Sequence, residues 1–150
     1  MLTFDPHGIY GHIDHIKIHR AATAAFWSAG GVMSPAPKRL FYSAIAAERM
    51  KQMQSLRKNS PLAELNADLY GVKEDSFAAV IDVRAYAKQK EGAVQAHRSQ
   101  VGPSSSFAGM NDAAEKELWD EMFARETFTL GGLRGAFPAM PVDDLLKGLS

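Results

Sequence analysis

The chain has 150 residues, 46% hydrophobic and 23% charged, which is the composition of one globular domain. Seventeen basic side chains balance seventeen acidic ones, which argues against a nucleic-acid-binding protein. There are no cysteines, so a disulfide framework and thiolate chemistry are excluded. No apolar run is long enough to span a membrane, and no signal-peptide pattern opens the chain. We therefore expect a cytoplasmic protein that binds neither nucleic acid nor membrane.

The first third of the chain predicts a strand, a helix and a second strand. Leu2-Thr3-Phe4 is typical of the end of a buried strand. Residues 13–27 have the alanine-rich composition of a helix, and Gly30-Gly31 is its expected end. Residues 39–44 alternate as a strand does.

Helices and strands continue to alternate further along the chain. Helices are expected at residues 46–58, 63–70, 84–100 and 112–125, and strands at residues 77–83 and 128–130. Residues 102–106 predict a flexible loop, and Gly131-Gly132 with the prolines after it predicts an irregular tail. Met50 and Met53 are expected to fill the core. This alternation predicts an α/β layered fold with a mostly parallel sheet.

A histidine-rich stretch lies between the first predicted strand and the first predicted helix. It reads Gly8-Ile9-Tyr10-Gly11-His12-Ile13-Asp14-His15, at a strand–loop–helix corner where ligand sites are common. Histidines three residues apart share a face at a helix start, so one imidazole can bind a metal while the other donates a hydrogen bond. Asp14 can orient an imidazole; the alternative is an ordinary helix start in which Asp14 satisfies first-turn amides.

His19 and His97 are two further histidines to consider as ligands or catalytic residues. His19 lies four residues after His15, a spacing that can bind zinc on a helix, although a packed or solvated helix residue is the preferred interpretation. His97 is interpreted as a hydrogen-bonded packing residue rather than a catalytic one.

The segment from Thr3 to His15 resembles the second signature of the PIG-L/LmbE family of zinc-dependent N-deacetylases, in which Gly-x-Tyr-Gly-His-Pro-Asp-His follows a strand. Ile13 stands where the family usually has proline, a residue that suits the first helical position but is not needed for the chemistry. Later segments are similar to family patterns in the same order, so the resemblance spans nearly the whole chain: residues 37–42, Lys88 with residues 96–100, residues 125–128 and residues 143–149.

The resemblance implies a Rossmann-like fold and metal-dependent hydrolysis of an N-acetyl amide on an amino-sugar conjugate, with zinc or iron as the metal. Carried over residue by residue, His15 matches a zinc ligand. His12 matches the histidine that stabilises the developing oxyanion and protonates the leaving amine, and Asp14 matches its orienting carboxylate. Tyr10 matches a tyrosine near the substrate carbonyl.

The family's first signature, His-Pro-Asp-Asp-Glu, has no counterpart in the 150 residues. Residues 1–150 are therefore expected to form the C-terminal portion of such a deacetylase domain, inactive alone and working with a separate N-terminal half or as a homo-oligomer. The first strand is expected to lack sheet neighbours. The alternative is a non-catalytic fragment or interaction module that keeps the fold without the chemistry.

Overall fold

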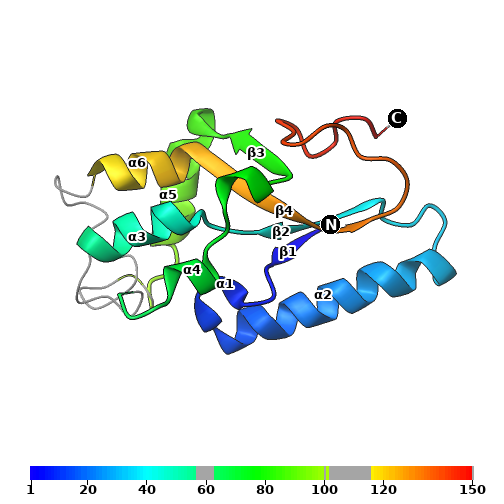
Figure 1. The fold of residues 1–150 in the computed structure, drawn as a ribbon, viewed down its shortest axis with the longest axis horizontal. Coiled ribbons are helices and arrows are strands. Elements are labelled where there is room, and N and C mark those ends of the chain that lie inside the picture. Colours follow the sequence, from blue (N-terminus) through cyan, green and yellow to red (C-terminus); the bar gives the residue numbers. More distant parts are fainter. Residues whose placement is uncertain (57–62, 100, 102–115, 150) are drawn as a thin grey trace.

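The computed structural model describes residues 1–56, 63–99, 101 and 116–149 (Figure 1). The loop predicted at residues 102–106 and the start of the helix predicted at residues 112–125 lie outside this part of the chain.

A four-stranded sheet forms the centre of the fold, in the spatial order β1 (Leu2–Phe4), β2 (Arg39–Ser43), β4 (Arg125–Leu133) and β3 (Ala79–Asp82). β1 and β2 are parallel, whereas β4 is antiparallel to both β2 and β3. The predicted α/β class is confirmed, and the arrangement is that of a partial Rossmann-like fold. The expectation of mostly parallel pairing is corrected, because β4 lies between two strands that run against it. The expectation that the first strand lacks sheet neighbours is also corrected on one side, because β1 pairs with β2.

The reversed direction of β4 follows from its connection. The helix α6 (Lys116–Ala124) is followed directly by β4, which begins at the next residue, Arg125. No crossover connection therefore returns the chain to the end of the sheet where a parallel strand would have to begin. β1, β2 and β3 run in one direction, and their carboxyl ends meet at one edge of the sheet. This edge is the usual place for a ligand site in α/β folds.

The remaining helices are α1 (Gly8–Gly11), α2 (Ile13–Val32), α3 (Ala47–Leu56), α4 (Ala67–Tyr70) and α5 (Ala87–Gln95), with 3₁₀ turns at Glu74–Ser76 and Arg84–Tyr86. Among these helices, α4 and α5 are shorter than the sequence predicts, whereas α2 extends further, to Val32. Met50 and Met53 are buried, as expected. His97 lies beyond α5, exposed, with its Nδ1 2.8 Å from the Ala93 carbonyl.

The sheet is covered differently on its two sides. α2 packs along one side, where Phe26 is fully buried and Thr23 lies 3.0 Å from the Tyr42 hydroxyl (Figure 1). The segment after β4 covers the other side, where Val142 and Phe137 pack on Phe41. The structure thus has one helical layer and one irregular layer around these strands.

Two glycine pairs predicted as breakers lie inside regular elements. Gly131 and Gly132 belong to β4. Glycine is needed at position 131 because a Cβ there would clash with the ring of Tyr42. Gly30 and Gly31 belong to α2, where a Cβ on Gly30 would meet Arg134 at 2.9 Å. These positions need a missing side chain for close approach, which the sequence pattern does not distinguish from a break.

Arg134 ties the end of α2 to the sheet. Its guanidinium donates to the carbonyls of Phe26 and Pro37 at 2.5 and 2.8 Å and lies over the Phe26 ring. In the described part of the chain, no helix combines the length and apolarity needed to cross a bilayer.

Candidate functional site

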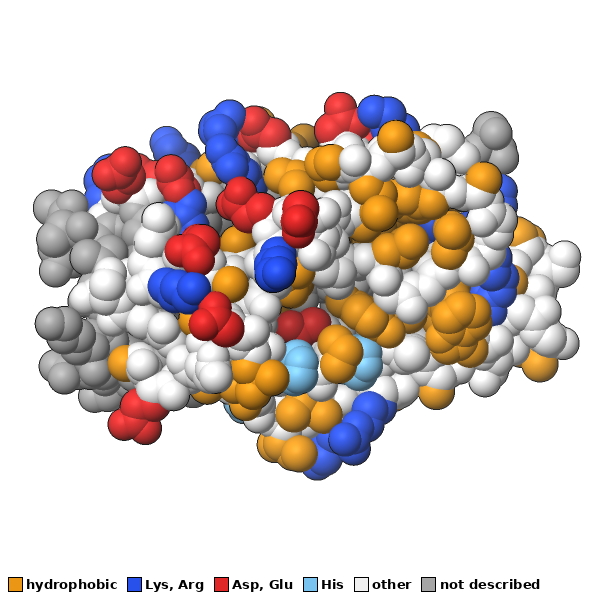
Figure 2. Space-filling model, in the orientation of Figure 1, with side chains coloured by type: hydrophobic (Ala, Val, Ile, Leu, Met, Phe, Trp, Pro, Cys, Tyr) orange, Lys and Arg blue, Asp and Glu red, His pale blue; other side chains and the backbone are white. Residues whose placement is uncertain are grey.

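The histidine-rich stretch occupies the corner between β1 and α2, as the sequence predicts. β1 ends at Phe4, a tight turn follows, and α2 begins at Ile13. Because β1 is parallel to β2, the corner lies at the carboxyl edge of both strands. On the face drawn in Figure 2, histidine side chains border a recess that has an acidic side chain at its floor.

The turn has an unusual backbone. Gly8 and Ile9 both have positive φ angles, 63° and 66°. Gly8 is buried, and a Cβ there would lie 2.9 Å from the Cβ of His15. Asp5 closes the turn: its carbonyl accepts from the Gly8 N–H at 3.0 Å and its Oδ1 accepts from the Ile9 N–H at 2.8 Å.

His15 is held between the turn and the strand. Its ring stacks on Phe4 with a centroid distance of 3.9 Å and an interplanar angle of 8°. Its Nδ1 lies 3.2 Å from the Gly8 carbonyl oxygen, an atom that can only accept. The neutral imidazole therefore carries its proton on Nδ1 and has its lone pair on Nε2, the arrangement common in histidines that bind metal.

His12 has the opposite arrangement. It is the N-cap of α2, and its Nδ1 accepts a hydrogen bond from the Asp14 backbone N–H at 3.2 Å. The neutral ring therefore carries its proton on Nε2 and can donate it. His12 is exposed, and its ring centre lies 4.7 Å from that of His15.

Asp14 contacts His12 through its backbone rather than its side chain. The exposed carboxylate lies in the first turn of α2, where negative charge is favourable. The orienting role that the resemblance implies for this carboxylate stays a prediction.

Tyr10 joins the two histidines. Its ring meets those of His12 and His15 edge to face, at 5.9 and 5.3 Å. Burial raises the pKa of the Tyr10 hydroxyl, so it stays protonated and can donate at neutral pH. The structure therefore brings Tyr10, His12 and His15 together.

The other two N-terminal histidines have different surroundings. The Nδ1 of His19 lies 2.8 Å from the Phe4 carbonyl, and its ring packs against Tyr42. His7 meets the ring of Tyr70, from α4, edge to face. Each of these contacts anchors the corner to a neighbouring element.

Two residues of the corner were missed by the sequence analysis. Asp5 is 4% exposed, and its position before Pro6 and Gly8 is a turn signal that could have identified it. Tyr70 lies across from Gly11, and only the fold brings it there, since it is 59 residues away along the chain.

A metal ion fits this corner only in part. The free Nε2 of His15 is a suitable ligand atom. Among the residues that the structure describes, however, no three His, Cys, Asp or Glu side chains gather to hold a metal ion. A catalytic zinc site needs about three protein ligands, so the described residues alone do not supply a complete one.

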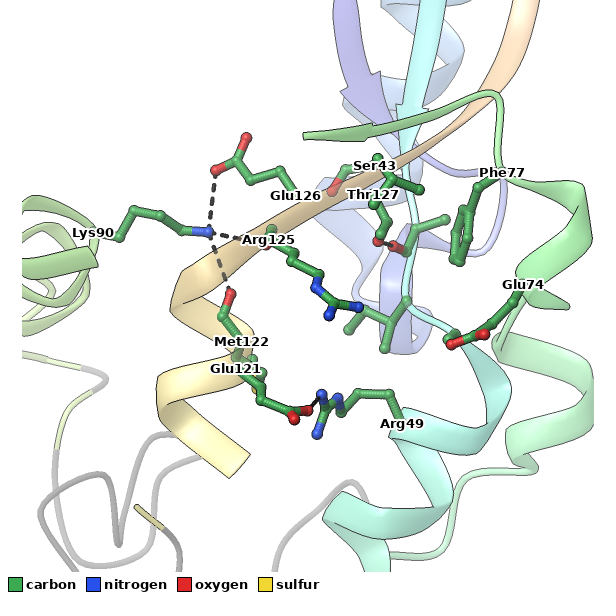
Figure 3. A pocket seen from close by; sticks show the side chains of 14 residues that line it. Ser43, Arg49, Glu74, Phe77, Lys90, Glu121, Met122, Arg125, Glu126 and Thr127 are labelled. Carbon is green, nitrogen blue, oxygen red and sulfur yellow. Dashed lines mark hydrogen bonds and ion pairs between the residues drawn. The ribbon is translucent and has the colours of Figure 1, made fainter. Parts of the chain in front are cut away.

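A separate cavity of about 380 Å³ lies between α3, α6 and β4 (Figure 3). Arg49 forms an ion pair there with Glu121, and Lys90 lies 3.3 Å from Glu126. Burial, and then the neighbouring charge of Arg125, lower the pKa of Arg49. Three basic and three acidic side chains line the cavity, and it includes none of Tyr10, His12, Asp14 and His15.

Several curated proteins are similar to most of this chain. The chain is 34% identical over 129 residues to a 1D-myo-inositol 2-acetamido-2-deoxy-alpha-D-glucopyranoside deacetylase of Saccharomonospora viridis, covering 82% of the chain and 46% of the relative. Proteins with the same name from Thermomonospora curvata and Geodermatophilus obscurus are 31% and 30% identical, covering 90% and 99% of the chain and 48% and 54% of the relatives.

The chain thus spans about half the length of the curated relatives it matches. No protein-family profile matches it.

Proposed function

Because the chain belongs to the PIG-L/LmbE family of N-deacetylases, we propose that it supplies part of the site of an enzyme that hydrolyses the N-acetyl amide of an N-acetylglucosaminyl conjugate. The observation that carries this proposal is the pair of neighbouring histidines whose Nδ1 atoms face opposite kinds of backbone group, an N–H for His12 and a carbonyl for His15. One offers a lone pair and the other a proton, as amide hydrolysis at a metal requires.

His15 is the proposed metal ligand. Its Nδ1–H is bonded to the Gly8 carbonyl, which fixes the ring and leaves Nε2 free. The metal, zinc or iron, would polarise the acetyl carbonyl and activate a water molecule. Its remaining ligands are proposed to come from a His-Pro-Asp-Asp-Glu segment outside these 150 residues.

His12 and Tyr10 are the proposed donors to the reacting amide. The Nε2–H of His12 would stabilise the oxyanion that develops on the acetyl oxygen and then protonate the leaving amine. The Tyr10 hydroxyl, kept protonated by burial, would donate to the same carbonyl oxygen. Asp14 is proposed to support His12.

Two broader features accompany this proposal. The substrate is proposed to be a small amino-sugar conjugate such as the one that the relatives' name describes. A cytoplasmic location is proposed, since a chain without cysteines needs no oxidising compartment.

The test is deacetylation of an N-acetylglucosaminyl inositol by the purified 150-residue chain with zinc, alone and with a second polypeptide that carries the His-Pro-Asp-Asp-Glu segment. We expect no turnover by the chain alone and clear turnover by the mixture. The control replaces the chain in this mixture by its His12→Ala variant. Turnover that remains in the control comes from the second polypeptide and not from this chain.

The alternative function is a non-catalytic interaction module, which is favoured by the incomplete metal-ligand set of the described residues. A mixture that binds zinc tightly but does not deacetylate the substrate would support this alternative. Turnover that is lost with His12→Ala would exclude it.

A further inference from the structure

We propose that Asp5 is a positioning residue that holds the Gly8–Ile9 peptide group in a strained orientation and so fixes the proton position of His15. This inference rests on the proposed function only for its consequence, the binding of a metal by His15. The orientation of the Gly8–Ile9 peptide group involves only residues of this chain.

Asp5 is placed for this role by its burial and its bonds. It is one of two buried charged residues in the described part of the chain, with 4% of its surface exposed. A buried carboxylate is unfavourable unless it is hydrogen-bonded. Its Oδ1 accepts from the Ile9 N–H at 2.8 Å, a charge-assisted bond to the backbone.

The turn that receives this bond is strained. Ile9 has φ 66° and ψ −55°, and it is the only non-glycine residue with positive φ among those that the structure describes. A β-branched residue is strongly disfavoured there, because its side chain crowds the backbone. Such a conformation persists only where its surroundings hold it in place.

The same peptide group carries both interactions. The Ile9 N–H and the Gly8 carbonyl belong to one planar amide, on which N–H and C=O point in opposite directions. The carboxylate of Asp5 binds the N–H end, and the Nδ1 of His15 binds the C=O end at 3.2 Å. If the amide rotates, both bonds are lost together.

The consequence for His15 is specific. Without the Gly8 carbonyl, a neutral imidazole is free to move its proton to Nε2, the atom that would otherwise bind a metal. Asp5 therefore acts on His15 through the intervening Gly8–Ile9 peptide group.

The test reads the proton position of His15 by ¹⁵N NMR of the histidine rings in the 150-residue chain, at about pH 8.5, above the ordinary imidazole pKa of about 6.5. In wild type we expect the proton on Nδ1. In Asp5→Ala we expect a mixture of both forms. Asp5→Asn should keep the wild-type form, because its amide oxygen can still accept from Ile9.

A rescue variant separates this role from general stability. Glycine adopts positive φ without strain, so Asp5→Ala combined with Ile9→Gly should restore the Nδ1 form. Asp144→Ala is the matched control, since it removes a similar 2.8 Å bond, donated by the Leu146 N–H to the Asp144 carboxylate, outside the histidine corner. It should leave His15 unchanged.

The outcomes are distinct. A folded Asp5→Ala variant with the wild-type His15 form would overturn the proposal. If Asp5→Ala does not fold, Asp5→Asn and the double variant decide: wild-type His15 spectra in both support the proposal, and altered spectra in both overturn it. In the assembled mixture, zinc titration should show that Asp5→Ala lowers the zinc affinity about tenfold or more. Failure of the mixture to deacetylate would count against the proposed function and leave the NMR result standing.

Discussion

The rings of His12 and His15 lie 4.7 Å apart and carry their protons on opposite nitrogens, because Nδ1 of His12 accepts from a backbone N–H while Nδ1 of His15 donates to a backbone carbonyl. Two histidines of the same type, three residues apart, are thereby made chemically different. The difference comes from the backbone around them, since both partners are main-chain atoms.

This asymmetry predicts different effects for the two alanine variants. In the assembled enzyme, His15→Ala should lower the metal content, whereas His12→Ala should keep the metal and reduce turnover by roughly a hundredfold or more, as expected for a lost proton donor. Metal analysis and steady-state kinetics measure both. His97→Ala, which removes an exposed histidine beyond α5, is the control and should change neither. The reverse pattern of metal loss would refute the assignment.

A second prediction concerns the Asp14 carboxylate. If it orients His12 during the reaction, Asp14→Asn should keep the fold and the metal but lower turnover about tenfold or more, because the imidazole is less well placed. The backbone bond from Asp14 to His12 is retained in this variant, so it does not confound the result. Unchanged turnover across the pH range would assign Asp14 to a helix-start role alone.

The sequence predicted the location of the site better than its internal geometry. The order of β1, the histidine stretch and α2 could be predicted because apolar periodicity and glycine spacing are local signals. The proton positions could not be predicted, since they depend on the orientation of the Gly8–Ile9 amide, whose N–H donates to Asp5. The extent of β4 was also missed, because Gly131 serves the approach of the Tyr42 ring from another strand.

A third prediction tests the turn itself. Gly8→Ala combines a positive φ with a Cβ that would lie 2.9 Å from His15 and 3.0 Å from Ile16. Gly135→Ala has a positive φ but no neighbour within 4 Å, so it isolates the backbone strain of about 1–2 kcal/mol. Urea unfolding should show a larger loss of stability for Gly8→Ala than for Gly135→Ala, by at least about 1 kcal/mol. Equal losses would mean that the turn adapts to a side chain.

A fourth prediction concerns how α4, which carries Tyr70, is held. Lys51 on α3 lies 2.9 Å from Asp68 on α4 and 3.0 Å from Glu48. Hydrogen bonds to Asp68 and then Glu48 raise the pKa of Lys51 above 10.5. Because the folded-state pKa is raised, the stabilisation is fully present below pH 10.5 and is lost as the pH rises through the folded-state value.

Lys51→Met should therefore be slightly less stable than wild type at pH 8 in low salt, and the difference should shrink above pH 10.5 or in about 1 M salt. Urea unfolding at the two pH values measures it. Lys88→Met removes an exposed lysine on α5 for which the described residues show no ion pair, and it should give no such pH-dependent difference. A difference that persists at high pH would point to packing by the Lys51 stem.

The clamp that Arg134 forms at the far end of α2 has a mechanical consequence for the histidines. The helix is tied to β1 at His19 and to Arg134 at the carbonyls of Phe26 and Trp27. At about 1.5 Å per residue, the arm from His19 to Phe26 is about 10 Å and the arm from His19 to His15 is about 6 Å. If the helix pivots as a rigid rod about His19, a shift of about 1 Å at the clamp moves His15 by about 0.6 Å, slightly more than the roughly 0.5 Å that a catalytic site tolerates. Sequence changes that loosen the Arg134 clamp therefore reach the histidines with little attenuation.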